Sequence, residues 1–499
     1  MADFKVSDRM LELTFNCKRR IVEPSVYDDV IERYDKLYNP KNTGGSRLAC
    51  VQFNNKIRSA REFYDAISDT NINLIALCLQ DIRSIFKDER QENCVIYPID
   101  MVLMVILLAK LSGFNTAKEI ASYYKSRYLQ LICMLPDLPG PEHMLSASSI
   151  NRVMRLFTTD EINELLFSYF KPHPKLKELI LENEEQRPRP EHASRPTVGF
   201  DGQEITKTFV RGETSRRKKA AIGVTVYDCS AKKVLAYQAV KKKNNEADAF
   251  LQMLPNLSIQ GSIVCADALN TRGDISTELN KRGIDYLFNI KDNAGNKELR
   301  GHIEAIFSRE YAKGDKSEMK TRSYIQKEHG RIDQYTVNTL PATLLDNRIK
   351  NPHQEVKTLV EYIKESSYII NGKVVKTTKN TRWYISSLEF SDENADQILY
   401  CILDYWSLEQ HHSRLDDPKV FNQDDTQSCS ADYSSSLLGI NKVSYNILSW
   451  IRQKLIKEST KKSYRPSYSM VQDMLAEMTV FEVFEYLAEY YRDVNFSEE

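Results

Sequence analysis

Hydrophobic and polar residues alternate in the middle of the chain as short apolar runs, typical of strands, and longer runs with helical periodicity. Three strands are expected first, followed by a helix, a strand, a second helix and a further strand. In chain order these elements cover residues 197–200, 221–227, 234–240, 246–254, 263–266, 274–281 and 286–290. The pattern predicts an α/β domain.

Asp201 and Asp267 directly follow the first and the fourth of these strands. A β-β-β-α-β-α-β order is that of a ribonuclease H-like mixed five-stranded sheet, in which these two strands are neighbours, so the two carboxylates should lie close together. Close carboxylates repel unless cations separate them, and Mg²⁺ prefers oxygen ligands, which predicts a two-metal site acting on phosphodiesters. Taken singly, Asp201-Gly202 is also a common turn pair, and Asp267 is also a suitable helix cap.

A third carboxylate is expected on a later helix at residues 395–412. At about 100° per residue, Ile398, Ile402 and Tyr405 form one apolar stripe of this helix, and Glu409 lies on the same stripe. Because an unpaired charge on an apolar face is costly, two alternatives follow. Either a metal or a basic partner compensates Glu409, or the helix is rotated and Glu409 faces solvent.

Helical patterns dominate both ends of the chain. Residues 1–96 are predicted to form a helical extension, with helices at 26–38 and 60–86. Residues 97–181 are predicted to form short helices joined by turns, with helices at 101–111, 116–124 and 129–135. A further helix, capped by Ser148 or Ser149 and reaching Phe157, carries Asn151, Arg152 and Arg155. Such a helix is compatible with a helix-turn-helix-like DNA reader, and the alternative is an ordinary helical bundle.

Composition shifts predict the remaining boundaries. The Pro- and Arg-containing segment 182–196 reads as a linker to a catalytic domain at 197–457. The stretch between Asp267 and Glu409 is longer than two sheet elements require, which predicts a β-rich insertion at about 300–390, with strands within 324–340 and 356–388. A serine-rich bend at 428–436, a helix at 437–457 and a helical tail at 458–499 complete the chain.

Composition narrows the class of protein. A hydrophobic fraction of 41% with 28% charged residues is typical of a soluble globular protein. The longest apolar run, 101–109, is too short to span a bilayer, so no membrane partner and a cytoplasmic location are expected. The nine cysteines form no Cys-x-x-Cys pair, which argues against a zinc ribbon. The adjacent His411 and His412 point about 100° apart on a helix, which argues against a shared zinc ion.

The charge balance limits how nucleic acid can bind. With 69 basic and 69 acidic residues, contacts with DNA must come from local patches, although any such patch can equally be a solvated face. Two basic runs flank the strands beside Asp201. One further pair of polar residues follows the fifth strand, and another pair lies in the insertion. These candidates are Arg216, Arg217, Lys218 and Lys219; Lys241, Lys242 and Lys243; Lys291 and Asn293; and His329 and Arg331.

Seven short motifs between Tyr97 and Lys457 together resemble the H-repeat-associated (ISAs-type) transposases of bacterial insertion sequences. They occur in the family's order and with sensible spacing. The motifs are Phe200-Asp201-Gly202, Asn245-Glu246, Val264-Cys265-Ala266-Asp267-Ala268, Asp285-Tyr286-Leu287-Phe288-Asn289-Ile290-Lys291-Asp292-Asn293, His329-Gly330-Arg331, Trp383-Tyr384-Ile385-Ser386-Ser387-Leu388 and Trp406-Ser407-Leu408-Glu409-Gln410.

The resemblance implies a DDE transposase whose catalytic, metal-holding triad is Asp201, Asp267 and Glu409. It further implies two Mg²⁺ ions, for which Mn²⁺ can substitute, and a helical DNA-binding region before the sheet. The implied partner is double-stranded DNA, both the element ends and the target. The resemblance also implies a homodimer or higher assembly on DNA, which would associate with the nucleoid. The alternatives are an inactive DNA-binding relic and a ribonuclease H-like nuclease.

The chain departs from the family pattern at several positions. Gln203 stands where the family usually has lysine, Arg272 stands for a glutamine after the second aspartate, and Gln410 stands for an asparagine after the glutamate. The basic residue expected before Glu409 on its helix is missing. Basic residues follow instead, namely His411, His412 and Arg414.

Overall fold

The computed structural model describes residues 22–495 except 68–72, 92–94, 136, 170–188, 206, 209–221, 241–245, 293–294, 315–317, 329, 347, 371–372, 427–429 and 462–463. The chain divides into two compact units. The sheet unit comprises Glu184–Gln203 and Ile222–Ser413, and the helical unit comprises Met1–Asn183, Glu204–Ala221 and Arg414–Glu499. Each unit is built around its own buried apolar core.

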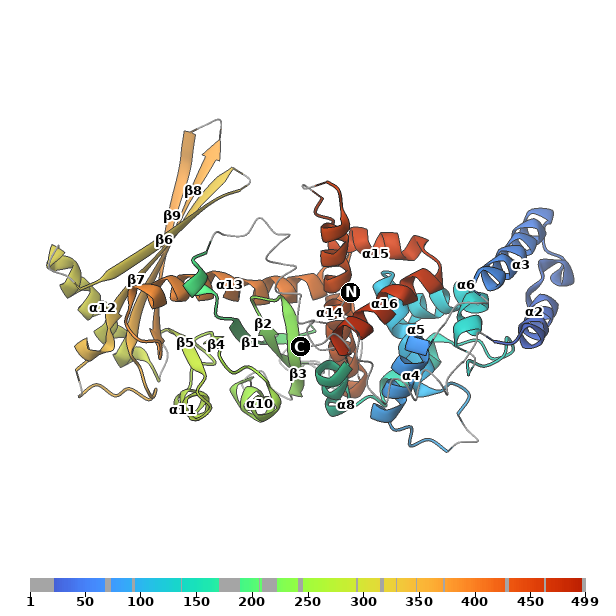
Figure 1. Cartoon of the computed structure of the whole chain (residues 1–499), viewed down its shortest axis with the longest axis horizontal. Coiled ribbons are helices and arrows are strands. Elements are labelled where there is room, and N and C mark those ends of the chain that lie inside the picture. The colour runs from blue at the N-terminus through green and yellow to red at the C-terminus, as the bar shows by residue number, and fades with distance from the viewer. Residues whose placement is uncertain are drawn as a thin grey trace, which may run out of the picture. The chain divides into compact units, whose positions relative to one another are not determined.

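A nine-stranded sheet forms the sheet unit, with the strand order β3-β2-β1-β4-β5-β9-β8-β7-β6 (Figure 1). The neighbourhood of the first and fourth strands, expected from the element order, is confirmed. The strands are β1 Thr197–Glu204, β2 Ile222–Asp228, β3 Lys233–Val240, β4 Ile263–Ala266, β5 Asp285–Ile290, β6 Lys320–Glu328, β7 Arg331–Pro341, β8 Thr358–Ile370 and β9 Lys373–Ser386.

Parallel pairing organises the centre of this sheet. β1 pairs with β4 and β4 pairs with β5, both in parallel. Helix α10 (Glu246–Met253) lies between β3 and β4 in the chain, and α11 (Gly273–Lys281) connects β4 to β5. All four residues of β4 are buried, which suits a strand covered on both faces. β1 continues to Glu204, so the expectation that Asp201 closes this strand is wrong. The Asp201-Gly202 pair lies in extended backbone and forms no turn.

The strands of the insertion continue the sheet of the five expected core strands, so a single sheet has nine strands. β6 pairs with β7 and β8 with β9, which gives two antiparallel hairpins as the alternating pattern predicts. β9 then pairs with β5, from Leu287 opposite Ser386 to Ile290 opposite Trp383. The open edge of β5 therefore accepts the insertion as a continuation of the same sheet. The 300–390 segment also contains most of helix α12 (Lys297–Ala312).

Helix α13 (Asp392–Asp416) lies across the sheet (Figure 1). Its residues Ile398 and Ile402 are buried in a core that includes Leu287, Val337 and Val360 from three strands. The expected apolar stripe is therefore correct in its first turns, and its contact with the sheet fixes the direction in which the helix continues toward Glu409.

The helical unit contains the two ends of the chain. Every residue of α5 is buried, and this helix packs against α4, α6 and α14. None of the helices within the described residues is long and apolar enough to cross a membrane. The helices are α2 Pro24–Tyr38, α3 Arg47–Ile67, α4 Asn73–Ile85, α5 Ile99–Leu111, α6 Ala117–Met134, α7 Ala147–Met154, α8 Thr159–Glu164, α14 Ala431–Glu458, α15 Tyr468–Glu477 and α16 Val480–Asn495.

Several expected helix boundaries in this unit are wrong. Segments 116–124 and 129–135 form the single helix α6, because a Thr116–Glu119 capping box starts it and no glycine or proline interrupts it. The run at 60–86 divides between α3 and α4.

The expected serine positions also need correction. Helix α7 begins earlier than expected and is capped by Ser146 instead of Ser148 or Ser149. The serine-rich segment belongs largely to α14, which begins at Ala431 after a Ser430 cap. The Ser434 hydroxyl donates to the Ser430 carbonyl at 2.8 Å, which satisfies the hydroxyl inside a helix instead of in a bend.

Gly199 sets how closely α13 approaches β1, and this gives a test of the packing. A Cβ at this position would lie 2.8 Å from Cε2 of Tyr405 and 3.1 Å from Cδ2 of Leu408. We expect Gly199→Ala to destabilise the protein by about 1–3 kcal/mol through overpacking, measured as the free energy of unfolding in denaturant. Gly301→Ala, on open space in α12, is the matched control and should stabilise slightly or have no effect. Equal effects of the two substitutions would contradict the close packing.

Candidate active site

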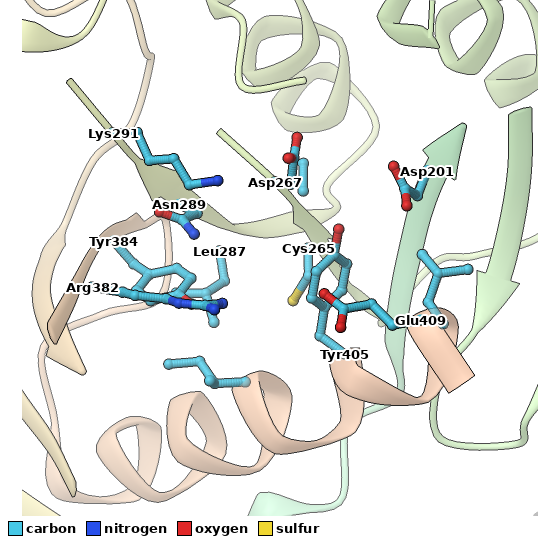
Figure 2. A pocket seen from close by; sticks show the side chains of 13 residues that line it. Asp201, Cys265, Asp267, Leu287, Asn289, Lys291, Arg382, Tyr384, Tyr405 and Glu409 are labelled. Carbon is cyan, nitrogen blue, oxygen red and sulfur yellow. The ribbon is translucent and has the colours of Figure 1, made fainter. Parts of the chain in front are cut away.

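A cavity of about 140 Å³ opens on the sheet unit at the C-terminal ends of β4 and β5. The three carboxylates singled out from the sequence, of Asp201, Asp267 and Glu409, all line it (Figure 2). The other lining residues are Cys265, Ala266, Leu287, Asn289, Lys291, Arg382, Tyr384, Ile402, Tyr405 and Leu408.

Strand register explains why these side chains meet. Gly199, Cys265 and Leu287 occupy one row across β1, β4 and β5. Side chains alternate between the two faces of a strand, so residues two positions further along point to the same face. That next row consists of Asp201, Asp267 and Asn289.

The turn after β4 orients the Asp267 carboxylate. Its Oδ1 accepts hydrogen bonds from the backbone N–H groups of Leu269 at 2.9 Å and Asn270 at 3.2 Å. The Thr271 hydroxyl donates to the carbonyl oxygens of Asp267 at 2.8 Å and Asn289 at 3.0 Å, which ties the turn to β5. Asp267 is not the cap of the next helix, since the N-cap position of α11 is Arg272.

Asp201 is half-buried and faces the end of α13. Its Oδ2 lies 3.6 Å from Nδ1 of His412. Gln203 is buried, and its side-chain amide donates to the His412 carbonyl oxygen at 3.3 Å. The glutamine that replaces the family's usual lysine therefore joins β1 to α13 instead of extending into the cavity.

Glu409 resolves the alternatives that the helical stripe left open. Ile398 and Ile402 are buried, whereas the Glu409 side chain is exposed and lies at the rim of the cavity. It is exposed to solvent, as in the second alternative, but without the expected rotation of the helix, and it borders the same cavity as the aspartates (Figure 2). Among the described residues, no three His, Cys, Asp or Glu side chains are gathered closely enough to hold a metal ion.

Tyr405 lies beneath the carboxylates, one helical turn before Glu409. Burial raises the pKa of its phenol well above the usual value, and the negative charges of Asp201 and Asp267 raise it further. The partly buried Tyr405 side chain, with its phenol neutral, lines the cavity together with the two aspartates.

Two cations line the other side of the cavity (Figure 2). Lys291 follows β5 and Arg382 belongs to β9, and neither has a carboxylate within ion-pair distance among the residues that the structure places. The Arg382 guanidinium lies 5.4 Å from the centroid of the Trp406 ring. Asn289 is 5% exposed, and its Oδ1 has no hydrogen-bond partner in the described part of the chain.

Sequence reasoning missed Asn289 and Arg382. The sequence offered a signal for both residues. Asn289 belongs to the motif that also contains Lys291, and Arg382 directly precedes the motif that begins with Trp383. Arg272, in contrast, does not line the cavity. It forms ion pairs with Asp274 and, at 2.6 Å, with Asp248.

The remaining candidate residues are not among those that line this cavity, or they fall outside the described residues. Arg331 lies at the start of β7, 2.8 Å from Asp333, and the expectation that it belongs with the site is not supported by the cavity lining. In the helical unit, Arg152 and Arg155 are exposed and Asn151 is half-buried. Outside the described residues are Arg216, Arg217, Lys218, Lys219, Lys241, Lys242, Lys243, Asn293 and His329.

Part of the chain matches a known domain family, and most of it is similar to proteins of Escherichia coli. Residues 194–400 match the transposase DDE domain family. The chain is 24% identical over 400 residues to YbfL of Escherichia coli (strain K12), covering 77% of this chain and 95% of YbfL. It is equally similar, with the same coverage, to the "H repeat-associated putative transposase YhhI" of that organism. A relative with the same descriptive name, YbfD, is 30% identical over 153 residues, or 30% of this chain and 57% of YbfD.

A solved structure shows a weak similarity to this chain. It is the cryo-EM structure of a piggyBac transposase synaptic complex with hairpin DNA, with a TM-score of 0.36 and 10% identity over 87% of this chain and 83% of the other. The matched DDE domain includes both aspartates of the cavity, and the H repeat-associated relatives extend over most of the chain. The chain is thus similar to the transposase DDE domain over residues 194–400 and, over most of its length, to an H repeat-associated putative transposase.

Proposed function

We propose that this protein is a DNA transposase that cleaves DNA at the ends of an insertion element and joins those ends to target DNA. The observation that carries the proposal is the convergence of Asp201, Asp267 and Glu409 on one cavity in a chain that matches the transposase DDE domain over residues 194–400. The strand order β3-β2-β1-β4-β5 is that expected of a ribonuclease H-like core, and it supports assigning this core to the catalytic domain.

The three carboxylates offer the ligand type for a pair of divalent cations, although in this structure they are not gathered closely enough to hold one ion together. They offer hard oxygen donors from strand β1, from the turn after β4 and from helix α13, the ligand type that Mg²⁺ and Mn²⁺ prefer. Bound cations would supply Lewis-acid stabilisation to the attacking and leaving oxygens of a phosphodiester. Asp267, already held by two backbone N–H groups, would keep its orientation on binding.

The cationic side of the cavity would hold the DNA strand. The planar guanidinium of Arg382 suits a phosphate, and its position near Trp406 limits the directions in which it can point. Lys291 would add a second positive charge beside the strand. In this way β9 would supply the basic group that the family pattern places on the helix before the glutamate.

Double-stranded DNA, as element ends and as target, would be the partner in this activity. We assign the gripping of element ends to the region 97–181, where α7 presents Arg152 to solvent, and expect the active form to be a homodimer or higher assembly on DNA. We assign the chemistry to the sheet unit, Glu184–Gln203 and Ile222–Ser413, which makes up most of the expected catalytic domain 197–457.

Asp201→Asn tests the chemistry. Removing one charge from the carboxylate set should lower Mg²⁺-dependent cleavage of element-end DNA by more than about 10³-fold, because these groups act as a unit. Binding of the same DNA, measured by fluorescence anisotropy, should be retained. Asp346→Asn, an exposed aspartate outside the cavity, is the control and should cleave normally. Normal cleavage by Asp201→Asn would rule out the assigned site.

Arg382→Ala tests the strand-holding side. Loss of charge-assisted hydrogen bonds to phosphate should weaken DNA binding by about 10- to 100-fold and reduce the salt dependence of binding by about one charge. Arg382→Lys should recover only part of the affinity because it lacks the planar fork. Arg348→Ala, on a largely exposed arginine away from the cavity, serves as the control. If the salt dependence of DNA binding were unchanged in Arg382→Ala, the arginine would only pack on Trp406 and would not bind phosphate.

The double substitution Asn151→Ala and Arg152→Ala tests the division of labour. Both residues lie on α7, and Arg152 is exposed, so their removal should impair binding of element ends without changing the melting temperature. Comparison with Asp201→Asn in parallel binding and cleavage assays separates the two roles. Normal end binding by the double variant would identify this region as a packing or multimerisation bundle.

A further inference from the structure

Glu246, the first residue of α10, makes two contacts that the proposed chemistry does not use. It is 5% exposed, which is unusual for a glutamate, and lies between the two segments that carry Asp201 and Asp267. Its position at a helix N-terminus makes the negative charge more favourable, but this does not explain which groups the carboxylate touches.

The first contact is with the backbone next to Asp201. Gly202 follows Asp201 in β1, and a Cβ on Gly202 would lie 2.1 Å from Oε1 of Glu246. Real atoms cannot approach so closely, so only glycine leaves room for the carboxylate at this place. Gly202 has no positive φ, so backbone conformation does not require a glycine here.

The second contact is with the turn that holds Asp267. The other oxygen of Glu246, Oε2, accepts a hydrogen bond from Nδ2 of Asn270 at 2.7 Å, and Asn270 is 4% exposed. The backbone N–H of Asn270 in turn donates to Oδ1 of Asp267 at 3.2 Å. One carboxylate therefore touches the strand of the first aspartate and, through Asn270, the turn of the second.

We propose that Glu246 is a positioning residue, which sets the spacing between Asp201 and Asp267 by joining Gly202 to Asn270. This inference rests on the proposed function, because the spacing matters only if the two aspartates act together. Glu246 would not touch substrate. Its removal would let the turn after β4 move relative to β1, and the two carboxylates would hold divalent cations less well.

Glu246→Ala is expected to lower the single-turnover cleavage rate by about 10- to 100-fold, the loss typical when a group that orients a metal-holding side chain is removed. The Mg²⁺ concentration for half-maximal rate should rise, while the affinity for element-end DNA and the melting temperature stay close to those of the parent. Glu246→Gln keeps an oxygen that can accept from Asn270 and should retain most of the activity. Equal losses in the Ala and Gln variants would overturn the positioning role.

Gly202→Ala provides an independent test from the other side of the contact. The added methyl group should displace the Glu246 carboxylate and reproduce the loss seen in Glu246→Ala. In the double variant Gly202→Ala with Glu246→Ala, the added methyl group should lower the cleavage rate little further, because the carboxylate that it would displace is already absent. Gly301→Ala is the matched control on open space. If the reductions in cleavage rate of the two single variants multiplied in the double variant, the proposed contact would be overturned.

The proposed function can fail separately. If Asp201→Asn cleaves normally, the site assignment is wrong whatever the Glu246 variants do. If Asp201→Asn is inactive while Glu246→Ala and Gly202→Ala keep the parent's rate and Mg²⁺ requirement, the function stands and the role of Glu246 is refuted. Loss of DNA binding together with a lowered melting temperature in Glu246→Ala would likewise refute positioning and indicate a general structural role.

Discussion

The parallel register of β1, β4 and β5 is the constraint on which the cavity depends. Backbone hydrogen bonds place Gly199, Cys265 and Leu287 in one row, and the next row on the same face carries the polar groups. A slip of a single residue in either pairing would turn one strand's side chains to the opposite face. The convergence of Asp201 and Asp267 is thus a consequence of backbone pairing, and their side chains do not need to attract each other.

Helix α13 adds the third carboxylate through apolar packing. Ile398 and Ile402 are buried against the sheet, and burial of such side chains stabilises by about 1.5–3 kcal/mol each. The missing side chain at Gly199 admits Tyr405 at close range, and Glu409 follows one turn later at the rim. Positioning of a charged group is therefore achieved by hydrophobic contacts elsewhere on its helix, which lets the carboxylate itself remain solvated.

Widening of the sheet by the insertion changes the composition of the cavity. Because β9 pairs with β5, Asn289 lies opposite Tyr384, and the strand brings Arg382 to the side facing the aspartates. The insertion is consequently part of the wall of the cavity as well as an addition to the sheet. This arrangement places opposite charges on its two sides, with the apolar ring of Tyr405 and the side chains of Leu287 and Ile402 between them.

The sequence by itself determined the central strands and helices and the two aspartates that follow apolar strands, because these depend on residues a few positions apart. It also identified Glu409 from helical periodicity. Only the tertiary structure decided that the sheet has nine strands, that β1 continues through Asp201, and that Arg382 and Asn289 join the cavity while Arg331 pairs with Asp333. The physical reason is that strand pairing and side-chain proximity arise from contacts between segments far apart in the chain, which local patterns of hydrophobic and polar residues do not encode.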